Sequence, residues 1–416
     1  MVGFLPLQIG GSTLAVHTIL RFLGYLFVDR LKISTDVWSP LNALVIMHKL
    51  SFFPLGNADT TLISLENSKE FLFDFANVAN PDDSADKRAK VDAELRDYMK
   101  SRGKDTFEIV GFTHGDGDHT KGSDQFFHFD RFPSLQGTGR FKIKELWVPA
   151  GMIVEKNAED DARLLRQEAR YRLRQGYGIR VFSRPQQLAD WFASEGISIE
   201  SRAHLITDAG QIAPAPTLES DGVEFFAHSP FGHRQDEETV IDRNKNCLAF
   251  QARFSVNGAV TDLLMLSDVE WESLTAIINI TRTHHNDERL HWDVCKIPHH
   301  CSAFSLNAEK GETKTTPTDS IDWLYGNRGN GAIFICSSDV IPAGETTQPP
   351  HFQAANYYKQ KIDEVVLGKW LVTMSQPSAS NPKKIEIEIG SHGAKHLLRT
   401  AVGGAAMTGR SGPRVG

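Results

Sequence analysis

Hydrophobic residues from about position 47 onward occur in short runs separated by polar turns. Apolar runs at residues 48–54, 60–65 and 71–75 are typical of buried strands. Residues 81–84 then have the composition of a helix start, and apolar side chains follow at helical spacing. A further strand is expected at 107–112, so the order strand, helix, strand predicts an α/β fold.

The alternation continues downstream. Strands are expected at 141–148, 223–227, 263–267 and 332–336, and helices at 158–175 and 187–192. In α/β sheets, functional groups gather in the loops that follow the carboxyl ends of strands. Polar residues directly after these strands are therefore the candidates for a site.

The strongest candidate follows the strand at 107–112, in the stretch Thr113–Gly122. His114, Asp116, Asp118 and His119 lie within six positions, with only glycines between them. Imidazole nitrogens and carboxylate oxygens on one short loop suit Zn, Fe or Mn. A plain polar turn and a calcium loop are the alternatives, but calcium loops use oxygen ligands and rarely imidazole. The spacing therefore favours a transition-metal site.

The pattern Thr-His-x-x-x-Asp-His after a strand resembles the signature of the metallo-β-lactamase fold, which is usually His-x-His-x-Asp-His. Asp116 stands where the second histidine of that signature is found. The variant resembles the hydrolase domain of bacterial DNA-uptake (competence) channel proteins and its soluble relatives. The resemblance implies an αββα sandwich, in which two mixed β-sheets face each other and helices lie outside.

Three later segments match the order of motifs in this family. His228 follows the strand at 223–227, with His233 as a competitor. Asp268 follows a nearly all-apolar strand, where a carboxylate must be paired, protonated or metal-bound. The segment Lys296–Ser302 resembles the family's Lys-x-x-His-His-Gly-Ser, with Cys301 in place of glycine, as a packed side chain rather than a ligand. His351 is a weaker candidate near the site.

The resemblance also implies a ligand set for two divalent metal ions. One ion would be held by His114, Asp116 and His228, the other by Asp118, His119 and His299, with Asp268 bridging them. His300 is kept as a substrate-facing group or alternative ligand, so the catalytic candidates are Asp118 and His300. Asp59 and Asp74 are expected to support ligands rather than bind metal. Zinc is the family's commonest metal, and the carboxylate of Asp116 favours Mn or Fe more than an all-histidine site does.

Such a centre predicts a metal-dependent hydrolase whose nucleophile is a metal-bound hydroxide. The relatives favour a phosphodiester substrate, either nucleic acid or a nucleotide. Alternatives are a thioester, a lactone or another acyl substrate, and a di-iron oxidoreductase, whose relatives carry a flavin domain not apparent here. Arginines at 163, 166 and 170 share one face of the expected helix, either as a solvated face or as a contact to substrate phosphate.

Composition limits the remaining options. The chain has 416 residues, a net charge of −7 and four cysteines without a CxxC pair. These values predict a cytoplasmic protein without a general affinity for nucleic acid. Residues 1–46 are expected to form an N-terminal extension that is helical in part. Residues 13–28 are too short to span a membrane but suit an amphipathic helix packed on the domain or on a membrane surface. The hydrolase domain is expected at 47–395, followed by a disordered tail at 396–416.

A first prediction follows from these boundaries. A protein beginning at Met47 should fold and keep its metal, because every expected ligand lies downstream. Circular dichroism and metal analysis of the shortened protein would test this. Insoluble or metal-free protein would instead make residues 1–46 part of the core.

Overall fold

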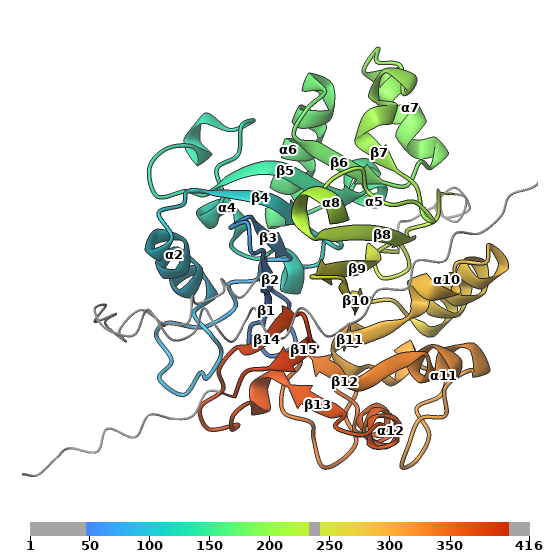
Figure 1. Ribbon diagram of the computed structural model, residues 1–416. Helices are drawn as coiled ribbons and strands as arrows, with labels where there is room; N and C mark the ends of the chain where they lie inside the picture. The colour runs from blue at the N-terminus through green and yellow to red at the C-terminus, as the bar shows by residue number, and fades with distance from the viewer. Residues whose placement is uncertain (1–46, 233–241, 399–416) are drawn as a thin grey trace, which may run out of the picture. The chain divides into compact units, whose positions relative to one another are not determined.

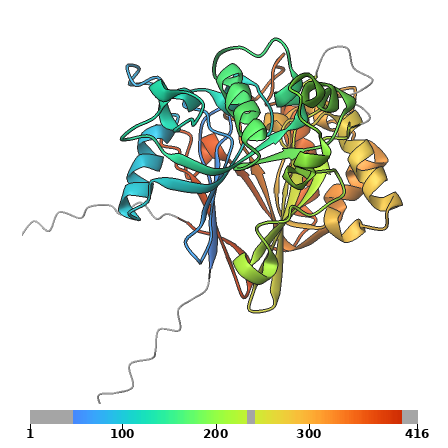
Figure 2. The ribbon, with the colours of Figure 1, turned by 90° about the horizontal axis from the view of Figure 1, so that it is seen from above.

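Two β-sheets face each other, and helices cover the outer face of each (Figures 1 and 2). The computed structural model describes residues 47–232 and 242–398. The expectations for residues 1–46, for His233 and for the tail beyond residue 398 lie outside this range. The predicted αββα architecture of two mixed sheets with outer helices is present in the described part of the chain.

The larger sheet has nine strands in the order β15-β14-β1-β2-β3-β4-β5-β6-β7. Pairing is antiparallel from β15 to β3 and parallel from β3 to β7. The strands are β1 (His48–Phe52), β2 (Thr61–Ser64), β3 (Glu70–Phe73), β4 (Thr106–Gly111), β5 (Lys142–Pro149), β6 (Ile179–Phe182), β7 (Ile206–Thr207), β14 (Ile385–Gly390) and β15 (Gly393–His396).

The smaller sheet has six strands in the order β13-β12-β11-β10-β9-β8. Pairing is parallel from β13 to β10 and antiparallel from β10 to β8. The strands are β8 (Val223–Ser229), β9 (Ala249–Val256), β10 (Ala259–Met265), β11 (Trp292–Lys296), β12 (Arg328–Cys336) and β13 (Lys369–Val372).

Three apolar layers account for this arrangement. Side chains from both sheets, such as Phe73, Trp147 and Phe250, form the central layer. The other face of the larger sheet packs on α2 (Val91–Ser101), α6 (Asp160–Gln175) and α7 (Gln186–Ser194). The other face of the smaller sheet packs on α10 (Trp271–Thr283), α11 (Asp319–Gly326) and α12 (Phe352–Asp363). Strands buried on both faces explain the continuous apolar runs in the sequence.

The helix between β3 and β4 starts later than the sequence predicted. Helix α2 begins at Val91 rather than near residues 81–84. The segment before it is held in turns, since the Asp86 carboxylate accepts from the Asn80 N–H at 2.8 Å and pairs with the Arg88 guanidinium at 2.6 Å. An aspartate that bonds to nearby backbone favours turns over helix.

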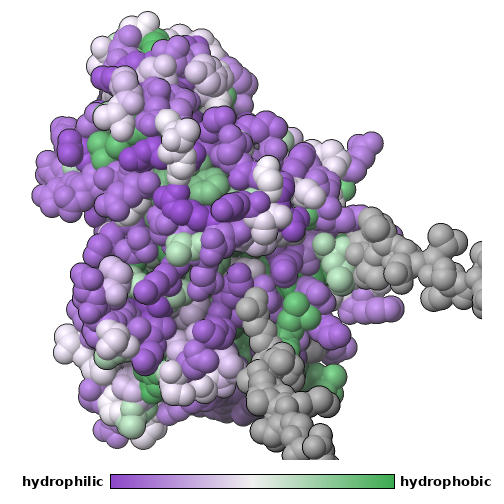
Figure 3. All heavy atoms as spheres, turned by 90° about the vertical axis from the view of Figure 1, so that its left-hand side faces the viewer, coloured by the Kyte–Doolittle hydropathy of each residue, from purple (hydrophilic) through white to green (hydrophobic). Residues whose placement is uncertain are grey.

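The visible surface is mostly hydrophilic, with hydrophobic residues scattered in small groups on the face shown in Figure 3. Among the described residues, no helix combines the length and the apolar character needed to cross a membrane. All four cysteines are free and buried.

Close packing at the end of β4 generates a second prediction. A methyl group on Gly111 would lie 2.7 Å from the Phe73 ring, so Gly111→Ala should lower the free energy of unfolding by about 1–3 kcal/mol. Phe73→Leu in the same chain should recover part of that loss. Gly344→Ala is the control, because a methyl group there meets nothing within 4 Å. Urea unfolding measures all three, and equal losses at Gly111 and Gly344 would contradict the packing argument.

Candidate metal centre

The candidate site lies where strands of both sheets end. The loop after β4 carries His114 and Asp116, and the short helix α3 (Gly117–Thr120) carries Asp118 and His119. From the other sheet, β10 leads to Asp268 and β11 leads to the turn η4 (His299–Cys301). Because β10 and β11 are parallel neighbours, their carboxyl ends meet at one edge of the sheet.

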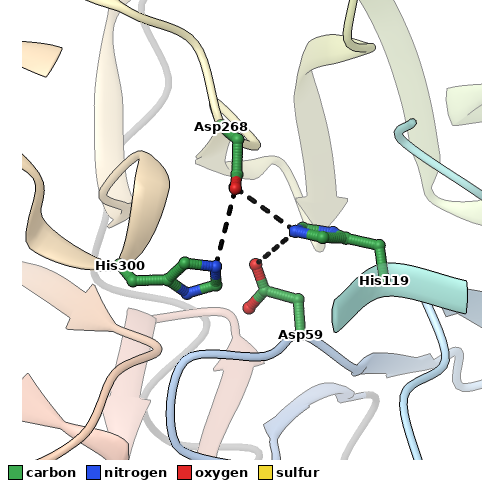
Figure 4. Close-up of side chains that lie close together, drawn as sticks. All are labelled: Asp59, His119, Asp268 and His300. Carbon is green, nitrogen blue, oxygen red and sulfur yellow. Dashed lines mark ion pairs between the residues drawn. The ribbon is translucent and has the colours of Figure 1, made fainter. Parts of the chain in front are cut away.

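Four buried side chains converge there, namely Asp59, His119, Asp268 and His300 (Figure 4). Each offers one nitrogen or oxygen, and these atoms all lie within 4.8 Å of one another. Asp268 lies between the imidazoles, with Oδ1 3.4 Å from His119 Nε2 and Oδ2 3.5 Å from His300 Nε2. Asp59 Oδ2 is 3.9 Å from His119 Nε2.

Asp118 extends this group on the solvent side. Its Oδ2 lies 3.1 Å from His300 Nε2 and 3.8 Å from His119 Nε2. The Asp118 side chain is 35% exposed, whereas His119 and His300 are buried. Asp118, His119, His300 and Asp268 therefore form one set of donors that is open to solvent at Asp118.

A second set lies beside the first and shares Asp268. His114 Nε2 is 3.3 Å from Asp116 Oδ2 and 4.0 Å from Asp268 Oδ2. The rings of His114 and His119 are 4.0 Å apart between centroids. His299 donates its backbone N–H to the Ser267 carbonyl at 3.0 Å, which places it next to Asp268. Burial lowers the pKa of His299. The charge of Asp268 acts in the opposite direction, but burial has the larger effect.

Unsatisfied polar atoms test whether this arrangement suits a metal. Within the described residues, the following buried atoms have no hydrogen-bond partner: Asp59 Oδ1, His114 Nε2, His119 Nε2, Asp268 Oδ1 and His299 Nδ1. Each such atom costs about 1–3 kcal/mol when left unpaired. Nitrogens and oxygens of this kind are the donors that divalent Zn, Mn or Fe bind. The residues present therefore fit a metal centre.

Supporting groups fix which imidazole nitrogen faces the site. Asp74 Oδ2 lies 2.9 Å from His119 Nδ1 and holds the Nδ1–H, so Nε2 is left for a ligand. Asp74 also accepts from the Thr113 N–H at 2.7 Å, which ties it to the loop Thr113–Gly122, called the metal loop below. His300 Nδ1 donates to the Ser337 carbonyl at 2.7 Å, which likewise directs its Nε2 into the cluster. Asp74 thus has the supporting role expected of it.

The charge state of the cluster follows from its packing. Burial alone would raise the pKa of Asp268, but the imidazoles of His119 and His300 hold it well below its usual range. Burial alone would lower the pKa of His300, but Asp268 and the hydrogen bond to Asp118 raise it to about 9. Asp268 is therefore ionised, and both of its oxygens are directed at imidazoles that a cation would bind.

The η4 turn holds its histidines in an uncommon backbone conformation. His299, His300 and Cys301 have φ values of 48°, 52° and 68°, in the left-handed region that favours glycine. Residues held there cost about 1–3 kcal/mol each and concentrate at functional sites. Cys301 is also buried in the outer core layer, so the thiol serves as a packed side chain.

Two expected residues have other partners. His228 Nε2 is 2.9 Å from the Arg289 carbonyl and its Nδ1 is 3.4 Å from Thr281 Oγ1, so neither nitrogen faces the cluster. Burial lowers the pKa of His228 to about 4. His351 accepts from the Ala303 N–H at 3.0 Å and supports the turn after the site. Of the other expected residues, His119, Asp268 and His300 converge with Asp59, and His114, Asp116 and Asp118 lie beside them. His299 is placed next to Asp268 by its backbone, and its Nδ1 is buried without a hydrogen-bond partner among the described residues. His300 stands in the group where His299 was favoured.

Three charged residues of the site were not given a role from the sequence. Lys296 Nζ lies 2.6 Å from Asp59 Oδ2, and both side chains are buried. Arg243 Nη1 lies 2.6 Å from Asp116 Oδ1, and its Nη2 lies 2.6 Å from Glu155 Oε1. Lys296 belongs to the Lys-x-x-His-His motif, which could have suggested it. No local pattern pointed to Arg243 or Glu155.

A second cluster of possible ligands differs in one respect. Asp262, His291 and Asp293 also lie close together. Here Asp262 is paired with Arg253 at 2.8 and 3.0 Å, and Asp293 accepts from the Asp262 N–H at 2.8 Å. Its carboxylates are satisfied by the protein itself, so this cluster has no comparable need for a cation.

Comparison with known proteins adds little at this level of similarity. No family model and no curated protein matches the chain. A solved diphosphatase from the PhnP family is 12% identical with a TM-score of 0.31, over 83% of this chain and 99% of the other. Metallo-β-lactamase SMB-1, bound to 2-mercaptoethanesulfonate, is 12% identical with a TM-score of 0.25, over 60% and 79%. Neither activity transfers to this chain on such values, and the fold stands on its own strand order and layers.

The geometry generates a third prediction. Asp268→Asn should lose at least one equivalent of bound metal, because an amide offers a weaker donor between the two groups. Elemental analysis of the purified protein measures this, and circular dichroism checks the fold. Asp293→Asn is the matched control in the second cluster and should keep its metal. Full metal content after Asp268→Asn, or equal loss in both variants, would remove Asp268 from the centre.

Proposed function

We propose that this protein is a metal-dependent hydrolase with a binuclear centre, and that its substrate is an anionic ester, most readily a phosphodiester of a nucleotide or nucleic acid. The observation that carries the proposal is the convergence of buried, unpaired imidazole and carboxylate atoms from both sheets. The motif order and the αββα architecture agree with the metallo-β-lactamase fold that the sequence resembles.

The donors divide naturally between two ions. His114, Asp116 and His299 would hold one, and Asp118, His119 and His300 the other, with Asp268 shared. His228 is left out because its nitrogens have partners elsewhere. Zinc is the first candidate, while the carboxylate of Asp116 keeps Mn and Fe open.

The charges around the centre support two ions. Asp59 has a fixed cation in Lys296, and Asp116 shares Arg243 with Glu155. Asp74, Asp118 and Asp268 have no lysine or arginine partner among the described residues, so with neutral imidazoles the group carries four more negative charges than positive ones. One divalent ion would leave it negative, whereas two would neutralise it.

Asp118 and His300 would act together with the bound ions. When bound, divalent ions lower the pKa of water and stabilise negative charge on an ester oxygen. Asp118 Oδ2 and His300 Nε2 lie 3.1 Å apart and would hold the same ion, while the Asp118 side chain is 35% exposed, so its carboxylate is placed to take the proton of the attacking water. The Ser337 carbonyl holds the His300 ring in place through Nδ1.

The arginines of α6 largely have structural roles. Arg166 donates to the Lys156 carbonyl at 2.9 Å, and Arg170 to the Ile153 carbonyl at 2.8 Å. Arg172 is buried against Glu168. Arg163 differs, because it is exposed and makes no ion pair within the described residues. With Lys121 it borders a cavity of about 720 Å³ that also adjoins Gly115 and Gly117 of the loop after β4. Asp124, Glu159, Asp160 and Asp161 line the same cavity, so Arg163 and Lys121 lie among carboxylates there.

A fourth prediction tests the function through this cavity. Metal-loaded protein should hydrolyse a phosphodiester such as bis(p-nitrophenyl) phosphate and should lose that activity with a chelator. For a dinucleotide substrate, Arg163→Gln should raise KM roughly three- to tenfold with little change in kcat, as expected for about 1 kcal/mol from an exposed ion contact.

Arg174→Gln is the matched control, because Arg174 lies on the same helix but pairs with Glu195. Its KM should stay unchanged. A thioester and a lactone complete the substrate panel. Turnover of either one without phosphodiester cleavage would replace the proposal with an acyl hydrolase. Metal-free protein, or no turnover of any substrate after metal loading, would count against the hydrolase itself.

A further inference from the structure

The guanidinium of Arg243 joins two carboxylates beside the metal loop. Its Nη1 lies 2.6 Å from Asp116 Oδ1, while its Nε and Nη2 lie 3.0 and 2.6 Å from Glu155 Oε1. Glu155 follows the short helix α5 (Ala150–Val154), so the loop after β4 is tied to the loop after β5. Arginine suits this role because its planar fork presents several donors in fixed directions.

The contact sets the direction of the Asp116 carboxylate. With Oδ1 on Arg243, the other oxygen faces the site and lies 3.3 Å from His114 Nε2. The loop backbone also packs on the same guanidinium, because a methyl group on Gly115 would lie 3.7 Å from both Arg243 Nε and Glu155 Oε2. Arg243 therefore contacts the Asp116 side chain and lies beside Gly115.

Arg243 places a positive charge beside Asp116, the position at which the resembled motif has a histidine. An imidazole ligand is neutral, whereas a carboxylate adds a negative charge to a centre that already contains Asp118 and Asp268. A guanidinium 2.6 Å away, which Asp116 shares with Glu155, offsets part of that charge. All three nitrogens of Arg243 are engaged by Asp116 and Glu155, so the arginine is committed to the loop rather than to a substrate.

We propose that Arg243 is a positioning residue for the first metal position, which holds Asp116 Oδ2 toward the ion and balances the charge that this carboxylate adds. The inference rests on the metal centre proposed above. It predicts that arginine at 243 and aspartate at 116 work as a pair, so that the arginine loses its value when Asp116 becomes histidine.

A double-mutant cycle tests this pairing through metal affinity rather than activity. The variants are Arg243→Gln, Asp116→His and the two combined, loaded with Zn and titrated against a chromophoric chelator. Arg243→Gln alone should weaken one of the two ions by roughly tenfold or more, the usual effect of losing a group that orients a ligand. In the Asp116→His background the same change should cause little or no loss, because the carboxylate that Arg243 positions is absent and Arg243 is left paired with Glu155 alone.

Equal loss in both backgrounds would overturn the inference, because Arg243 would then act on the fold of the loop. Unchanged affinity in Arg243→Gln would overturn it as well. Arg243→Lys and Glu155→Gln keep the test open if Arg243→Gln does not fold. Lysine keeps the charge without bridging both carboxylates, so it should retain part of the affinity. Glu155→Gln should weaken the same ion less than Arg243→Gln does, and no effect from either variant would also contradict the pairing.

Failure of the broader proposal gives a different result. Wild-type protein that binds no metal would remove the proposed function together with this inference. Wild-type protein that binds two ions, with the same two affinities in Arg243→Gln, would remove only the role of Arg243.

Discussion

Several polar atoms of the site are buried without hydrogen-bond partners. His114, His119, Asp59, Asp268 and His299 each leave one nitrogen or oxygen unpaired within the described residues. Such atoms are costly in a protein interior, and a fold keeps them only if something compensates. A divalent ion would do so for several atoms at once, because coordination bonds would replace the missing hydrogen bonds.

The packing of the two sheets brings these atoms together. The central apolar layer holds the sheets face to face, and this places the end of β4 opposite the ends of β10 and β11. Backbone hydrogen bonds then join the loops, as from Asp59 N–H to the Asp118 carbonyl and from Leu248 N–H to the Thr113 carbonyl. The strained η4 turn is tolerated because the buried core on one side and the Ser337 carbonyl on the other hold it in place.

Two carboxylates at the centre are paired with positively charged lysine or arginine side chains, whereas Asp268 has no such partner among the described residues. Lys296 compensates Asp59 in the interior, and Arg243 compensates Asp116 at the edge. Asp268 between them remains available for metal. The contrast with Asp262, which is paired with Arg253, shows how a carboxylate cluster looks when the protein satisfies it by itself. Charge pairing, rather than the number of acidic residues, separates the two clusters.

The sequence by itself determined what depends on short stretches of chain. The strands around residues 48–75 and 107–112 were predicted from apolar runs. The loop from His114 to His119 was recognisable as a candidate metal site because its four polar side chains lie within six positions. Asp268 was recognisable as a carboxylate at the end of an apolar strand. The tertiary structure decided what depends on partners distant in sequence. In the folded chain the nitrogens of His228 contact Arg289 and Thr281 instead of the cluster. His300 rather than His299 lies beside Asp118. Arg243 contacts Asp116, although the two are 127 positions apart in the sequence. Hydrophobic periodicity and ligand spacing are local properties, whereas the direction of a side chain and the neutralisation of its charge are settled only when the sheets pack together.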